Sequence, residues 1–139
     1  KDNIGFTLIE VLVVIGIIAI LATIVLIAIN PARQFAQARN TQRTSHVNSI
    51  LNAVGQRIAD NKGVFEGTLN GVTCPTLPST TTTIGNMFDN CLAPTYLTAI
   101  PVESVSGQPG YTVVASSTTG RITIAAPAAE LNESISVTR

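Results

Sequence analysis

Residues 6–29 read FTLIEVLVVIGIIAILATIVLIAI, an apolar run that one charged residue, Glu10, interrupts. At about 1.5 Å of rise per residue, a helix of this length measures about 36 Å, which exceeds the roughly 30 Å of a bilayer's hydrocarbon core. A membrane-spanning helix is therefore the first interpretation. A carboxylate at the bilayer centre costs about 2.5 to 3.5 kcal/mol, so such charges usually have a partner or a function. Glu10 would need a cationic partner if the helix moved into another dry environment.

Two ordinary interpretations explain less of this run. A secretory signal peptide has a shorter apolar region of about 7 to 15 residues, followed by a small-residue cleavage site. A plain single-pass anchor accounts for the length of the run, but it leaves the charge of Glu10 without a role. Both interpretations stay open as alternatives.

The block GFTLIE at residues 5–10, followed by some twenty apolar residues, resembles the processing and assembly signal of type IV pilins and of the pseudopilins of type II secretion. The resemblance implies that a prepilin peptidase cuts after Gly5 and that the new N-terminal Phe6 is N-methylated. It also implies that Glu10 pairs with the N-terminal amine of a neighbouring subunit. An α-amino group has a reference pKa of about 7.7 to 8, so it is largely cationic at pH 7 and can neutralise a buried carboxylate.

The residues before Gly5 depart from the family pattern. Members of the family usually have Lys or Arg directly before the glycine, whereas here Asp2, Asn3 and Ile4 separate it from Lys1. We expect residues 1–5 to be a leader remnant. If the remnant were retained, the free amine would lie on Lys1, away from Glu10.

The helix is expected to continue beyond the apolar run. Asn30-Pro31 predicts a kink, because proline disfavours the helical conformation in the preceding residue and removes one backbone donor. The sequence NKG at residues 61–63 is typical of a helix end. The sequence thus predicts one long bent helix of about 55 residues, or roughly 80 Å. Its second half has an apolar stripe at helical spacing, formed by Val47, Ile50, Leu51, Val54 and Ile58.

Four arginines in this second half precede the first acidic residue, Asp60; they are Arg33, Arg39, Arg43 and Arg57. Such a basic surface could contact anionic lipid headgroups, acidic neighbours or DNA. We favour a solvated helix face with ion-pair partners on an adjacent subunit, because no aromatic residues interleave to stack on single strands. DNA binding is thus possible but unsupported. His46, the only histidine, is expected to be a surface residue and not a metal ligand.

Residues 64–94 are rich in Gly, Pro and Thr, and they are expected to form a long loop. Cys74 and Cys91 lie inside it. Two cysteines in an exported domain favour a disulfide, which would contribute about 3 kcal/mol by closing a loop of this size. A metal site would need more ligands, and a redox pair is more often closely spaced.

Four segments beyond the loop have strand character: residues 96–100, 111–115, 121–126 and 134–138. The second and third are β-branched, and the polar residues between them suit a hairpin. The fold class is therefore α+β, with a long N-terminal helix covered by a small C-terminal antiparallel sheet. We expect residues 6–30 to be a transmembrane or filament-core helix, residues 31–62 an amphipathic helix, and residues 63–139 a globular domain of loop plus sheet.

Composition and motifs argue against catalysis and wholesale nucleic-acid binding. The formal net charge is zero and 12% of residues are charged. The sequence has no nucleophile elbow, phosphate-binding loop or zinc-protease motif, so we expect neither an enzyme nor a cofactor or metal. Asp89, Asn90 and Glu103 could offer oxygen ligands to Ca²⁺, as in some major pseudopilins, but they are scattered in the sequence.

Together with the resemblance, these patterns predict a major pilin, the structural subunit of a type IV pilus. The subunit would be stored in the inner membrane as a single-pass protein. After cleavage by the prepilin peptidase, the pilus assembly machinery would build it into a helical homopolymer on the cell surface, where such fibres serve adhesion or motility. The alternatives are a major pseudopilin of a type II secretion system and a monomeric, membrane-tethered extracytoplasmic binding domain.

Overall fold

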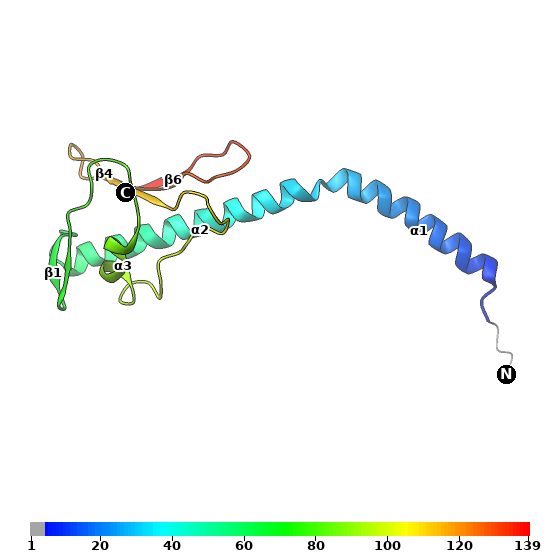
Figure 1. Ribbon diagram of the computed structural model, residues 1–139, viewed down its shortest axis with the longest axis horizontal. Coiled ribbons are helices and arrows are strands. Elements are labelled where there is room, and N and C mark those ends of the chain that lie inside the picture. The colour runs from blue at the N-terminus through cyan, green and yellow to red at the C-terminus, as the bar shows by residue number, and fades with distance from the viewer. Residues whose placement is uncertain (1–4) are drawn as a thin grey trace. The chain divides into compact units, whose positions relative to one another are not determined.

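The computed structural model describes residues 5–139, without the side chains of residues 86 and 87. Except for Gly5, the expected leader remnant at residues 1–5 lies outside the described residues. The chain divides into two compact units, Lys1–Phe35 and Ala36–Arg139 (Figure 1). Long helices at the N-terminal end and antiparallel strands at the C-terminal end confirm the predicted α+β class.

The helical part consists of two helices, α1 (Leu8–Ile29) and α2 (Pro31–Asp60), that meet at Asn30. Asn30 has a left-handed backbone, with φ of +42°, which ends α1. Its side-chain oxygen accepts a hydrogen bond from the Arg33 N–H at 3.3 Å, so it also caps the start of α2. Pro31 suits the first helical position because its missing N–H would have no partner there. The predicted long N-terminal helix is thus confirmed, and a left-handed residue interrupts its backbone where the sequence predicts a kink.

The C-terminal end of α2 follows the predicted pattern. Lys62 and Gly63 have positive φ angles of 57° and 94°. The Gly63 N–H donates to the Ile58 carbonyl at 2.8 Å, which satisfies a carbonyl that the helix leaves without a partner. Glycine adopts this backbone at little cost, and the helix ends where the sequence indicated.

The main sheet has the strand order β3-β4-β5-β6, and all its pairs are antiparallel. Its strands are β3 (Thr82–Thr83), β4 (Thr112–Ala115), β5 (Ile122–Ala126) and β6 (Ile135–Thr138). Val113 of β4 lies opposite Ile124 of β5, and both side chains are buried in one core with the apolar stripe of α2. Figure 1 shows the strands running along α2. The last three expected strands are thus confirmed, with their edges moved by one residue at most.

Residues 64–94 contain more structure than the expected loop. They form a hairpin of β1 (Gly67–Leu69) and β2 (Val72–Cys74), and a short helix, α3 (Asn86–Leu92). Asn70 and Gly71 connect the two hairpin strands with positive φ angles of 51° and 82°. Asn-Gly is the preferred pair for such a two-residue turn, so the expectation of loop alone was wrong where a local signal existed.

The expected strand at residues 96–100 is also wrong. The backbone N–H groups of Tyr96 and Leu97 both donate to the Leu92 carbonyl, at 2.8 and 3.0 Å. These bonds fold the segment into a turn at the end of α3, and they make the two N–H groups unavailable for a sheet. Pro94 and Pro101 bracket the segment and supply no N–H of their own.

Candidate functional site: the N-terminal helix and the domain that carries it

Glu10 and Thr7 cap the start of α1 reciprocally. The Thr7 hydroxyl accepts a hydrogen bond from the Glu10 N–H at 3.3 Å, and the Thr7 N–H donates to Glu10 Oε2 at 2.9 Å. The Thr7 hydroxyl also donates to Glu10 Oε2 at 2.8 Å. This is a capping box, in which two backbone donors of the first turn gain acceptors. The Glu10 carboxylate therefore also caps the helix, a role that the sequence analysis missed. The pattern Thr-x-x-Glu is the recognised sequence signal of a capping box.

Gly5 and Phe6 precede α1 and are exposed, Phe6 to 88%. The peptide bond between them lies outside regular secondary structure. Thr7 and Glu10 both lie beyond this bond, so cleavage after Gly5 would leave the capping box intact. The new amine would then stand directly before the cap.

The surface of α1 is apolar on every side. None of its side chains is buried, and Leu8–Ile29 is the one helix among the described residues that is long and apolar enough to cross a membrane. Its mean hydropathy reaches 3.3 over the most apolar window. A helix that is apolar all round is stable in lipid or among similar helices, and not in water. α1 therefore requires an apolar surrounding, either lipid or other apolar helices.

Glu10 has one oxygen to offer a partner. The capping box uses Oε2, whereas Oε1 makes no hydrogen bond within residues 5–139. An ammonium group from a second chain could therefore bind Oε1 without breaking the cap. The N-terminal segment thus combines two exposed residues, Gly5 and Phe6, with one carboxylate and an apolar helix.

The basic surface expected on α2 does not face outward as predicted. Arg43 is buried, with 1% of its side chain exposed, and its guanidinium forms two parallel bonds with the Glu103 carboxylate at 2.7 and 3.0 Å. A third nitrogen of the same group donates to Glu130 at 2.9 Å. The expected partners on an adjacent subunit are thus replaced by carboxylates of the same chain.

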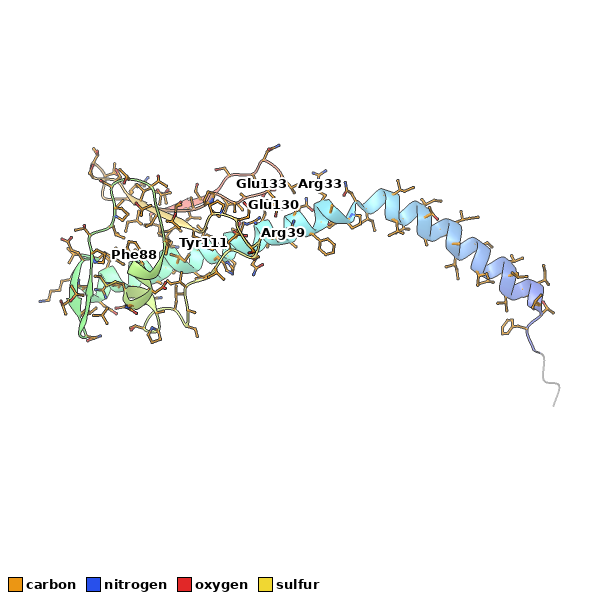
Figure 2. All side chains as sticks on the ribbon, viewed as in Figure 1. Arg33, Arg39, Phe88, Tyr111, Glu130 and Glu133 are labelled. Carbon is orange, nitrogen blue, oxygen red and sulfur yellow. A yellow bond between two sulfur atoms is a disulfide. The ribbon has the colours of Figure 1, made fainter. Side chains whose placement is uncertain are left out.

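Arg39 and Asn40 extend this arrangement along α2. Arg39 binds both oxygens of Glu130, at 2.6 and 2.8 Å. Asn40 donates to the Glu130 carbonyl at 2.8 Å and to the Glu133 carboxylate at 2.9 Å. Figure 2 shows Arg39, Glu130 and Glu133 gathered where the β5–β6 loop meets α2. We call the six residues the ion-pair cluster: Arg39, Asn40, Arg43, Glu103, Glu130 and Glu133.

Two carboxylates of the ion-pair cluster, Glu103 and Glu130, are held in the ionised form. Hydrogen bonds from Arg39, and then from Arg43, lower the pKa of Glu130 to about 2. The hydrogen bond from Arg43 likewise lowers the pKa of Glu103, against the opposing effect of burial. Charge-assisted bonds of this bidentate kind are among the stronger ones in proteins. The cluster therefore ties the β5–β6 loop and the segment around Glu103 to α2 at neutral pH.

Of the other two arginines on α2, Arg33 is exposed as predicted and Arg57 is not. Arg57 is buried, donates to the carbonyls of Phe65 and Gly67 at 3.0 Å each, and lies 5.4 Å from the centre of the Phe65 ring. It therefore anchors the segment that follows α2. His46, expected at the surface, is half-buried and its Nδ1 lies 2.6 Å from the Tyr111 hydroxyl.

Within the described part of the chain, no three His, Cys, Asp or Glu side chains are grouped so that they could hold an ion. Asp89 and Glu103 line the same surface groove, but the Glu103 carboxylate already forms an ion pair with Arg43. Cys74 and Cys91 form a disulfide that joins β2 to α3.

Sequence reasoning missed the acidic half of the ion-pair cluster. Its members lie 60 to 93 residues beyond their partners on α2. The available signal was charge balance, because an arginine-rich helix whose one acidic residue is Asp60 is followed by Glu103, Glu130 and Glu133 in a chain of zero net charge. That signal could suggest attraction but not which residues pair.

Comparison with known proteins bears on the N-terminal segment. Residues 1–26 match the family model described as the prokaryotic N-terminal methylation motif. No curated protein and no solved structure matches the chain. The matched range includes Gly5, Phe6, Glu10 and most of α1. This protein therefore carries the prepilin-type N-terminal motif that is found in type IV pilins and pseudopilins.

Proposed function

We propose that this protein is a major pilin, the structural subunit of a type IV pilus. The observation that carries the proposal is α1, a helix of 22 residues with no buried side chain, apolar on all sides and charged only at Glu10. The matched methylation motif supports the same assignment. Before assembly the subunit would be stored in the inner membrane, with α1 in lipid. During assembly α1 would be transferred from lipid into a bundle of identical helices.

Assembly follows from the similarity of the two environments. Lipid tails and leucine-rich helices are about equally apolar, so moving α1 from one to the other changes little hydrophobic free energy. A motor in the inner membrane can then transfer subunits at modest cost. The direction and register of packing must come from something other than hydrophobicity.

Glu10 supplies that register in the proposal. After cleavage by a prepilin peptidase, the amine of Phe6 on one subunit would bind Glu10 on the next. Both charges lie in a dry core, where an unpaired charge is strongly unfavourable. Packing arrangements that bring amine and carboxylate together are therefore preferred over shifted ones. The free oxygen Oε1 of Glu10 is the expected acceptor.

The N-terminus of the assembled subunit tests this function. We expect mass spectrometry of filaments sheared from cells to find N-methylated Phe6 as the first residue. Assembled filaments whose subunits begin before Phe6 would contradict the proposal, because the amine would then be separated from Glu10. Electron microscopy adds the second measurement: long surface filaments are expected of a pilus. A pseudopilus of a secretion system would not display them in normal cells, and a monomeric tethered domain would form none.

A further inference from the structure

The β5–β6 loop ends in a tight turn. The Glu133 N–H donates to the Glu130 carbonyl at 3.1 Å, which closes a four-residue turn. The two central residues, Leu131 and Asn132, have φ angles of 60° and 57°. Positive values at both central positions define a turn of type I′. Leu131 rarely adopts this backbone, whereas asparagine tolerates it well.

The two end residues of this turn, Glu130 and Glu133, belong to the ion-pair cluster, whereas its two central residues do not. Glu130 binds Arg39 and Arg43, and Glu133 binds Asn40. Leu131 and Asn132 are exposed. The side-chain amide of Asn132 makes no hydrogen bond within residues 5–139. The turn therefore presents a free amide on a fixed support.

The sequence around this amide is Asn132-Glu133-Ser134, the acceptor triplet for N-linked glycosylation. None of the other asparagines in the chain begins such a triplet. Turn geometry alone accounts for an asparagine at position 132, but it does not call for a hydroxyl two residues later. Ser134 is exposed and makes no hydrogen bond within the described part of the chain. Its hydroxyl is thus not used in holding the turn.

We propose that Asn132 is a glycosylation site that carries an N-linked saccharide in the native protein. This inference rests on the proposed function, because the second compact unit, Ala36–Arg139, must reach the far side of the membrane to meet the transferase. We call it the globular unit. The surface position suits the modification, since a bulky, hydrated group on an exposed turn displaces no packed side chain.

The reaction requires a lipid-linked oligosaccharide as co-substrate, a glycan joined to a polyprenyl diphosphate. Nδ2 of Asn132 forms a bond to the anomeric carbon of the first sugar, and the bond between that carbon and the diphosphate oxygen breaks. Polyprenyl diphosphate leaves with the bonding electrons, and the amide gives up one proton to a base of the transferase.

The chain is convenient for a direct test. Trypsin cleaves after Arg121, so residues 122–139 form one peptide whose only asparagine is Asn132. We expect this peptide from the native host's protein to carry a saccharide mass that fragmentation places on Asn132. Asn132→Gln and Ser134→Ala should each abolish the modification, whereas Ser134→Thr should keep it because the hydroxyl is retained. Ser134→Ala leaves both central turn residues unchanged, which guards against loss through misfolding.

Two results would overturn the inference. One is an unmodified peptide from wild-type protein whose globular unit is digested by protease added outside the inner membrane. The other is a saccharide that persists in Asn132→Gln, which would place it on a serine or threonine. A globular unit protected from external protease would instead contradict the proposed function, and with it this inference.

Discussion

Arg43 and Glu103 form a buried, bidentate ion pair between residues 60 positions apart in the chain. Their side chains are 1% and 6% exposed, so water contributes little to solvating either charge. The pair joins the middle of α2 to the segment that precedes β4. Because Arg43 also binds Glu130, one guanidinium holds two distant segments against the same helix.

Removal of the Arg43 guanidinium should destabilise the globular unit strongly. In Arg43→Met the volume is roughly kept, but the Glu103 carboxylate stays buried without a counter-charge. Breaking a buried pair from one side typically costs about 3 to 5 kcal/mol. We expect a loss of this size in the free energy of unfolding, measured by urea denaturation of the detergent-purified subunit with circular dichroism.

Arg33→Met is the matched control for this substitution. Arg33 lies on the same helix and is exposed, so its replacement should change the free energy of unfolding by less than about 0.5 kcal/mol. Replacing Arg43 with Met and Glu103 with Leu together should recover part of the loss, because no unpaired carboxylate then remains. Equal stabilities of Arg43→Met and Arg33→Met would contradict the role assigned to the ion-pair cluster.

Acid should weaken the globular unit in a defined range. Arg39 and Arg43 lower the pKa of Glu130 to about 2, and Arg43 lowers that of Glu103. A carboxylate with a depressed folded-state pKa contributes its full stabilisation above the unfolded value of about 4.3, and loses it as pH falls through the folded value. The thermal midpoint should therefore decline between about pH 4.5 and pH 2. Glu130→Gln should decline less over that range, and an unchanged slope would argue against this explanation.

The Cys74–Cys91 disulfide should matter for stability and not for membrane insertion. It closes a loop with a sequence separation of 17 residues between β2 and α3. In the chain-entropy model such a link contributes about 3 kcal/mol. We expect the double variant Cys74→Ala, Cys91→Ala to lose about that much in urea denaturation, while cell fractionation finds it in the membrane at wild-type level. Two free thiols, alkylated in unreduced native protein, would show that the bond does not form.

Glu10→Gln separates the two roles of Glu10. Glutamine can still accept the Thr7 N–H bond at the same position, so the helix cap should survive. Insertion should become easier, because a charge unwelcome in lipid is removed. Assembly should fall sharply, because the amine of the neighbouring subunit would be buried without its counter-ion, at a cost of about 3 to 5 kcal/mol.

Quantification of sheared filaments measures this effect, with membrane-fraction levels as the check on insertion. Val11→Ala, one residue along the same helix, trims apolar contact without changing charge and should assemble nearly normally. Filament yields of Glu10→Gln that match those of wild type would remove Glu10 from the assembly mechanism. A retained segment before Phe6, which would hold the amine away from Glu10, would then be the better account.

Several parts of this molecule could be predicted from sequence because their signals are local. The apolar run of α1, the apolar stripe of α2 and the helix end at Lys62 and Gly63 depend on residues within a few positions of one another. The β-branched runs predicted β4 and β5 for the same reason. Asn70-Gly71 is a local signal too, since this pair is typical of the two-residue turn that connects β1 and β2.

Tertiary structure alone decided which charges face water. Arg39, Arg43 and Arg57 looked equivalent to Arg33 in the sequence. Arg39 and Arg43 are engaged by distant carboxylates of the same chain, whereas Arg57 binds two backbone carbonyls 8 and 10 positions further along. Helical spacing tells which residues share a face, but it does not tell what approaches that face. The partners Glu103 and Glu130 come from segments whose positions depend on the closing of the whole core. An ion pair between residues 60 or more positions apart forms only after that folding, and no local pattern in the sequence encodes it.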